Sequence, residues 1–105
     1  MTTHPRTRLV ALLEQPVRFS VVAALAYVDE RSFKGLREEL DVTDSALSKH
    51  LTALEKGGLV RIKKQFVGKT PVTRASLTAE GQEAWCQHLE ALREIAAGPA
   101  RPASD

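Results

Sequence analysis

The sequence predicts a mostly α-helical α+β domain, in which helices come first, a β-hairpin follows, and a long helix closes the fold. Three patterns predict this class. Leucines recur at helical spacing over residues 33–56, apolar and charged residues alternate over residues 60–65, and a helical pattern returns after Thr78. A period of 3.6 residues is typical of an amphipathic helix, and a period of 2 is typical of a half-buried strand.

Length and composition favour one small domain with an aliphatic core. The chain has 105 residues, 43% of them hydrophobic and only 5% aromatic, and we expect one domain over residues 1–97. The small and polar residues 98–105 are expected to form a disordered tail. The sequence has no apolar run of about twenty residues, and Glu14 and Pro16 interrupt the N-terminal apolar patch. We therefore expect neither a membrane span nor a signal peptide.

The positive charge is concentrated in the middle of the chain. Residues 1–42 carry no net charge, residues 43–74 hold seven basic and two acidic residues, and residues 75–105 carry a net charge of −3. A basic segment with a net charge of +5 is the electrostatic footprint of phosphate contacts. A solvated basic surface without a partner is the alternative.

The first part of the chain predicts two helices. Residues 6–15 predict a short amphipathic helix, because their leucines fall at i, i+3 and i+4. These are Leu9, Leu12 and Leu13. Pro16 is expected to start the next helix, where its missing N–H does no harm. Val17–Tyr27 is apolar nearly all round and predicts the most buried helix. We expect a loop over Asp29–Ser32, with Phe33 in a very short strand.

Residues 34–57 predict two helices joined by a tight turn. The leucines of each helix lie on one face, so the two faces can pack together. They are Leu36 and Leu40 in the first helix, and Leu47, Leu51 and Leu54 in the second. Asp41–Asp44 supplies turn and N-cap residues, and Gly57-Gly58 closes the second helix. A short polar row then stays outside on the helix of residues 43–56, as expected for a helix in a DNA major groove.

A hairpin and a last helix follow. Val60 and Ile62 alternate with basic residues, which predicts a strand, and Gly68 is expected at the turn of a hairpin over about residues 59–77. Pro71 suits the start of a returning edge strand. Thr78 is expected to cap the long helix, whose apolar residues recur at helical spacing. They are Trp85, Leu89, Leu92 and Ala96.

The motifs TDSALSKHLTALEKGGLV and VGKTPVTRASLTAEG resemble those of bacterial winged-helix transcriptional regulators of the small MarR/ArsR-like group. The resemblance covers about residues 16–95. It implies a winged helix-turn-helix fold, with N-terminal and long C-terminal dimerisation helices, in a homodimeric repressor that binds a near-palindromic operator. The chain departs from the group's pattern at Lys34, which replaces a capping residue and predicts a weaker cap there. Val72 and Ala75 replace residues that are often basic and aromatic.

The polar helix and the hairpin provide the candidate DNA contacts. We expect Ser48 and Lys49 to contact base edges, Thr43 or Ser45 to bind a phosphate, and Lys69 to reach the minor groove or its phosphates. Basic side chains of the strands over residues 61–74 are phosphate contacts or solvated charges. The candidates on the recognition helix are Thr43, Asp44, Ser45, Ser48, Lys49 and Thr52, and those on the wing are Lys63, Lys64, Gly68, Lys69 and Arg74.

Both ends of the chain carry apolar helix faces that one small domain cannot fully cover. A second copy of the chain is therefore the expected partner, beside double-stranded DNA. The candidate interface residues are Leu9, Leu12, Leu13, Trp85, Leu89 and Leu92. A small apolar effector could bind between the terminal helices and the core, but the sequence identifies none.

Other functions have weaker support in the sequence. We expect no enzyme, because Ser48 and His50 point about 200° apart on a helix and no carboxylate is placed to orient His50. We expect no metal and no cofactor, since ligand spacing and phosphate loops are lacking. The lone Cys86 rules out an internal disulfide and fits a reducing, cytoplasmic compartment; it is an inert or a redox-active thiol. A winged helix used for protein contact is the alternative function.

Overall fold

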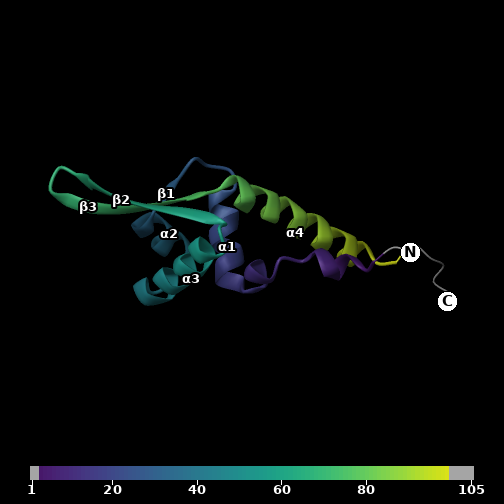
Figure 1. The fold of residues 1–105 in the computed structure, drawn as a ribbon. Helices are drawn as coiled ribbons and strands as arrows, with labels where there is room; N and C mark the ends of the chain where they lie inside the picture. The colour runs from purple at the N-terminus through teal and green to yellow at the C-terminus, as the bar shows by residue number, and fades with distance from the viewer. Residues whose placement is uncertain (1–2, 100–105) are drawn as a thin grey trace.

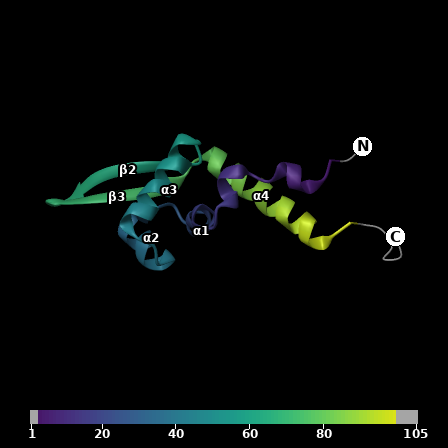
Figure 2. The ribbon, with the colours of Figure 1, turned by 90° about the horizontal axis from the view of Figure 1, so that it is seen from below.

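The computed structural model describes residues 3–99, so most of the expected tail over residues 98–105 lies outside the described residues. The molecule is elongated, with extents of 66 × 25 × 21 Å. The hairpin projects from one end, and α4 and the N-terminal segment form the other (Figures 1 and 2). In chain order, the elements are η1 (Pro5–Arg8), η2 (Ala11–Glu14), α1 (Pro16–Leu25), β1 (Arg31–Ser32), α2 (Phe33–Leu40), α3 (Asp44–Lys56), β2 (Val60–Val67), β3 (Thr70–Leu77) and α4 (Ala79–Ala97).

The helix predicted over residues 6–15 is wrong: this segment forms two short 3₁₀ helices separated by extended backbone at Leu9 and Val10. In a continuous helix the N–H of Val10 would donate to the carbonyl of Arg6, but here it donates to Nδ1 of His88. The carbonyl of Leu12, which would have no helical donor because Pro16 lacks an N–H, accepts from Nε of Arg18. Pro16 also disfavours helical backbone in the residue before it.

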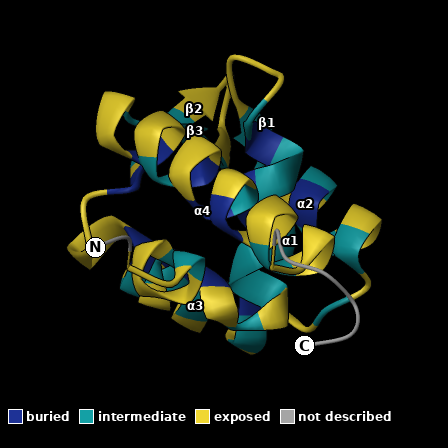
Figure 3. Cartoon of the chain, turned by 90° about the vertical axis from the view of Figure 1, so that its right-hand side faces the viewer, coloured by how far each residue is buried: buried dark blue, intermediate teal, exposed yellow. Residues whose placement is uncertain are grey.

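The first α-helix is the centre of the core, as its apolar sequence predicts. Pro16 occupies its first turn, and the Gln15 side chain accepts a hydrogen bond from the N–H of Arg18. Val21, Val22 and Leu25 are fully buried. Figure 3 shows that the buried residues lie on the inward sides of the helices. The helix ends at Leu25, earlier than the predicted Tyr27, whose side chain is exposed.

His88 of α4 is buried against the N-terminal segment and α1. Its Nδ1 accepts from the N–H of Val10 at 2.9 Å, and its ring lies 5.7 Å from that of Phe19. Burial lowers the pKa of His88, while the carboxylate of Glu14 acts in the opposite direction. The folded protein therefore holds His88 neutral, as an acceptor, at a pH where the unfolded chain begins to bind a proton.

We expect the His88 contribution to stability to be full above a pH of about 6.5 and to fall as the pH drops below it, because the unfolded chain then binds more protons than the folded one. Replacing His88 with glutamine keeps an acceptor for Val10 but removes the titration. Thermal unfolding from about pH 7 to about pH 5 should therefore show a smaller loss of Tm in His88→Gln than in the unsubstituted protein. The exposed His4→Gln variant is the matched control, and equal slopes in all three proteins would contradict the assignment.

The two helices of the helix-turn-helix are both capped. Ser32 caps α2 by accepting from the N–H of Gly35 at 3.0 Å, so the weaker cap predicted at Lys34 is wrong. Ser32 also belongs to β1, and the loop predicted over Asp29–Ser32 therefore ends in a short strand, which Phe33 follows rather than joins. Thr43 caps α3 by accepting from the N–H of Ala46.

The end of α3 is fixed by two glycines. The N–H of Leu59 donates to the Leu54 carbonyl and the N–H of Gly58 to the Glu55 carbonyl, and Gly58 has a φ of +80°. These two bonds and the left-handed residue make up a Schellman motif, which turns the chain directly into β2. Gly57 is approached so closely by Leu12 that an added Cβ would lie 2.2 Å from its Cδ1. The N-terminal segment thus packs on the end of α3.

The three strands form one antiparallel sheet in the order β1-β3-β2. Ile62 lies opposite Ala75, and Lys64 lies opposite Thr73. Residues that face each other across an antiparallel pair share a face of the sheet, as do residues two apart along a strand. The hairpin therefore turns one face towards α3, and the register fixes which side chains lie on it.

The last helix is joined to the root of the hairpin. Thr78 caps α4 by accepting from the N–H of Gly81, and it bonds the carbonyl of Gly58 through its hydroxyl and that of Leu59 through its N–H. Further along α4, Trp85 packs on Phe19 with ring centroids 5.0 Å apart. Within residues 3–99, no helix is both long and apolar enough to cross a bilayer.

Candidate nucleic-acid interface

The outer side of α3 carries a stripe of polar and basic side chains. Its members are spaced at i, i+4, i+7 and i+11, which places them along one line of a helix. They are Ser45, Lys49, Thr52 and Lys56, all of them exposed. The opposite side of α3 holds Leu47, Leu51 and Leu54 in the core. Such a helix can lie in a major groove without uncovering apolar surface.

The start of α3 is tied to α2 by an ion pair. The guanidinium of Arg37 lies 2.8 Å from the carboxylate of Asp44, and this contact raises the pKa of Arg37. Asp44 thereby links the two helices. Its negative charge also interacts favourably with the positive end of the α3 dipole. The Oγ1 of Thr43 accepts from the N–H of Ala46 and lies 3.5 Å from the Oγ of Ser45, so these two hydroxyls sit together at the start of α3, where hydroxyl protons can donate to a phosphate oxygen.

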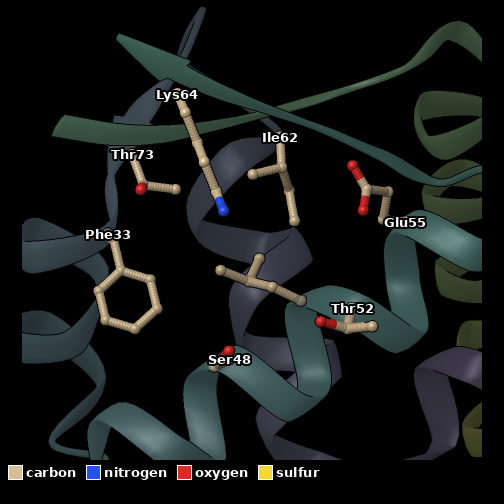
Figure 4. Close-up of a pocket in the computed structure, with 8 residues that line it drawn as sticks. Phe33, Ser48, Thr52, Glu55, Ile62, Lys64 and Thr73 are labelled. Atoms are coloured by element: carbon tan, nitrogen blue, oxygen red, sulfur yellow. The ribbon is translucent and has the colours of Figure 1, made fainter. Parts of the chain in front are cut away.

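A groove of about 390 Å³ separates α3 from the hairpin. Figure 4 shows Lys64 reaching from the hairpin towards α3, with the hydroxyls of Ser48 and Thr52 below it and the ring of Phe33 to one side. Glu55 lies at the other end of the groove. Ser48 thus lies on the edge of α3 that faces the hairpin, beside the outer stripe rather than in it.

His50 lies on the opposite edge of α3, beside α1. Its Nδ1 lies 3.5 Å from the Nη1 of Arg18, and the Nε of the same guanidinium donates to the carbonyl of Leu12. Burial lowers the pKa of His50, and the charges of Arg18 and Lys49 lower it further. The imidazole is therefore mostly neutral near pH 7, so it adds no positive charge to α3. Its contact with Arg18 helps to hold α3 against α1.

The predicted wing residues lie in three different places on the hairpin. Lys64 lies on the face towards α3, and Gly68 and Lys69 form the exposed turn. The structure does not bring Lys63 and Arg74 to this side: they pair across the strands on the other face. There the Nε of Arg74 lies 3.5 Å from the carboxylate of Glu30, in the loop before β1.

The predicted dimer residues are also divided. Leu13 is 1% exposed and Trp85 is 5% exposed, so both are buried in the core of their own chain and have little surface left to contact a partner. Leu9, Leu12 and Leu89 are half-buried, and Leu92 is 38% exposed. An apolar hollow of about 500 Å³ lies between the N-terminal segment and α4; it is lined by Leu9, Leu13, Glu14, Pro16, Phe19, His88 and Leu92.

Lys56, the last residue of α3, and Phe66 of β2 were not among the predicted DNA contacts. The spacing of Lys56 from Ser45 was a usable signal, because i and i+11 fall on one line of a helix. Phe66 follows Lys64 by two residues and so lies on the same face of the hairpin. It lies beyond the part of the hairpin that packs on the core, and it is exposed. Within residues 3–99, no group of three or more His, Cys, Asp or Glu side chains is placed to hold a metal ion.

Comparisons with known proteins agree with this geometry. Residues 17–96 match the family described as winged helix DNA-binding domain. An uncharacterised protein of Methanocaldococcus jannaschii is 29% identical over 79 residues, which span 75% of this chain and 86% of that protein. The solved structure of a transcriptional regulator homologue protein from Pyrococcus horikoshii has a TM-score of 0.79 and 28% identity, over 84% of this chain and 87% of that chain. NadR in complex with 4-hydroxyphenylacetate has a TM-score of 0.67 and 25% identity, over 83% of this chain and 64% of NadR.

Proposed function

The chain belongs to the winged helix DNA-binding domain family, as a DNA-binding transcription regulator of the MarR-like type, and from this premise we propose that it is a homodimeric repressor of a near-palindromic operator. The observation that carries the proposal is the stripe of Ser45, Lys49, Thr52 and Lys56, which lies next to a basic hairpin. In the proposed complex, α3 lies in the major groove and the hairpin crosses the backbone towards the adjacent minor groove. Occlusion of a promoter is the simplest mode of repression for such a protein.

The proposed dimer rests on the end of the molecule that lies away from the hairpin. Leu92 and the apolar hollow beside it present surface that a second copy would cover. A two-fold axis there would set the two α3 helices on one side of the assembly, about 34 Å apart on successive major grooves. Sedimentation equilibrium should give twice the mass of the 11.5 kDa chain, and a monomer at micromolar concentration would refute this part of the proposal.

We also propose that the protein acts by binding alone, without catalysis, in the cytoplasm with the chromosome. Two features of α3 support this. Ser48 faces the groove beside the hairpin, whereas His50 faces Arg18 on the opposite edge, so these two groups do not form a nucleophile and base pair. The stripe between them offers hydrogen-bond donors and positive charge, which suit base edges and phosphates.

Selection of bound sequences from random duplex DNA tests the proposed function. We expect enrichment of a near-palindrome whose half-sites are about one helical turn apart. A gel shift at two salt concentrations should show weaker binding at the higher one, because phosphate contacts release counterions. Binding that is absent or insensitive to salt would instead favour a winged helix used for protein contact.

Replacing Lys69 with alanine should weaken binding to every duplex by a similar factor. Lys69 lies in the exposed turn of the hairpin and is expected to neutralise one phosphate. The slope of log K against log salt should therefore flatten by about one unit per monomer. Fluorescence anisotropy over a salt series measures this slope. Arg93→Ala removes one positive charge from α4, far from the hairpin, and should leave the slope unchanged; a sequence-selective loss in Lys69→Ala would contradict the phosphate assignment.

A further inference from the structure

The tip of the hairpin is apolar as well as basic. Phe66 is 73% exposed and Val67 is 57% exposed, and Pro71 on the returning strand is also exposed. Neither a helix nor a loop of the described chain covers them, since the hairpin projects beyond α2 and α3 (Figure 1). Large apolar side chains on an exposed hairpin promote aggregation, and proteins ordinarily place charged residues there instead. We therefore ask which molecule covers the apolar tip when the protein is bound to a partner.

The register of the hairpin decides which way the ring of Phe66 faces. Phe66 lies opposite Pro71, and Lys64 lies opposite Thr73. Side chains two apart on a strand, and those opposite each other, share one face of the sheet. Phe66 and Pro71 therefore lie on the face of Lys64 and Thr73, both of which line the groove against α3. The apolar tip continues the DNA-facing side of the molecule, whereas Val67 lies on the other face.

The length of the hairpin places the ring beyond the major groove. Phe66 is four residues past Ile62, which lines the groove beside α3, and a strand rises about 3.3 Å per residue. The ring thus lies about 13 Å further out, which is close to the major-groove width of about 12 Å. With α3 in one major groove, the ring reaches past the phosphate backbone to the neighbouring minor groove.

We propose that Phe66, backed by Pro71, is an apolar wedge that enters the minor groove beside the bound α3 and partly unstacks one base step. The inference rests on the proposed function, in which α3 binds duplex DNA. Phenylalanine and proline are among the side chains that proteins insert between base steps, and such insertion kinks the duplex. Flexible pyrimidine–purine steps are the sites at which this costs least.

The charges around the tip favour DNA over a second hairpin as the occupant. Lys64 on the same face and Lys69 in the turn flank Phe66 along the hairpin, and neither takes part in an ion pair among the described residues. Two such tips would repel each other if they paired edge to edge, whereas the same lysines attract the phosphates on either side of a minor groove. In this arrangement the lysines contact phosphates, and the ring of Phe66 contacts the stacked bases.

The test uses the full chain and a 40-base-pair duplex of the sequence that it selects from random DNA, with 2-aminopurine placed in turn at each step under the hairpin. The unsubstituted protein should raise the 2-aminopurine fluorescence at one step and bend the duplex, as measured by energy transfer between its ends. Phe66→Ala should abolish the fluorescence rise, reduce the bend, and weaken binding about tenfold. Phe66→Leu should retain part of all three effects, and Val67→Ala on the opposite face should retain the fluorescence rise in full.

Each result decides between the wedge and its alternatives. If Phe66→Ala keeps the fluorescence rise and the bend, the wedge is overturned while DNA binding stands. If the unsubstituted protein selects no sequence and binds no duplex, both the wedge and the proposed function fail. If Phe66→Ala changes the mass of the free protein in sedimentation, the ring belongs to a contact between copies, and the wedge is overturned. Circular dichroism should show an unchanged helical content in all variants, because Phe66 lies outside the core.

Discussion

Replacing Gly81 with alanine is expected to lower the free energy of unfolding by about 3 kcal/mol, the largest loss that we predict for a single methyl group. An added Cβ would lie 2.0 Å from the carbonyl oxygen of Leu59 and 2.9 Å from its carbonyl carbon. Both are backbone atoms, so no side-chain rotation relieves the clash. The Leu59 carbonyl is also held by the N–H of Thr78, and the strand and helix must therefore separate.

Thermal unfolding followed by circular dichroism measures this effect. For a domain of this size, a loss of about 3 kcal/mol should lower Tm by on the order of 15 °C. Gln82→Ala is the matched control, since Gln82 is the next residue of α4 and is exposed. Its Tm should change little, because alanine favours a helix and no contact is lost. A Tm of Gly81→Ala equal to that of the control would show that the junction between β2 and α4 is not tightly packed.

Replacing Lys49 with glutamate should weaken binding to the selected duplex by about a hundredfold. Lys49 lies in the middle of the exposed stripe of α3, where the substitution removes a donor to bases or phosphates and adds a negative charge against the duplex. The loss should be larger than that of Lys69→Ala, which removes one phosphate contact at the tip of the hairpin. Stability should be almost unaffected, because Lys49 takes no part in the core.

Arg93→Glu controls for the change in net charge. Arg93 is exposed on α4 and pairs with Glu90. Figure 1 shows α4 on the other side of the molecule from the hairpin tip. Its reversal changes the net charge by the same amount as Lys49→Glu, so a general electrostatic effect would weaken binding equally in both variants. We expect the loss in Arg93→Glu to be much smaller, as measured by anisotropy at one salt concentration. Equal losses would mean that α3 does not contact the duplex.

The fold was predictable wherever local sequence and burial agree. The leucines of α3 lie on one face, and Thr43 and Gly58 mark its ends, so both its bounds and its buried side followed from spacing and capping. The N-terminal segment was not predictable in this way. Leu9, Leu12 and Leu13 fit a helical period, but His88 takes the N–H of Val10 from a position 78 residues away. A pattern within ten residues carries no information about such a partner.

The candidate site was predictable in its charge and only partly in its geometry. Helical spacing alone separates the exposed stripe of α3 from its buried side, and the basic residues of the hairpin are visible in the sequence. Alternation along β2 also assigns Lys63 and Lys64 to opposite faces, but which face meets α3 depends on the crossing of the hairpin over the helix. The ion pair of Arg74 with Glu30 required the position of the loop before β1 as well.

During translation, the two halves of the fold become complete at different times. The helices α1, α2 and α3 follow one another along the chain and share one core, so we expect them to pack together once Gly58 has left the ribosome. Val10 and Leu13 pack against His88, so they cannot be buried until α4 has been synthesised. Bringing these two segments together closes a loop that contains most of the chain. We therefore expect a nascent chain to form the helix-turn-helix before it gains the end of the molecule that is proposed to bind a second copy.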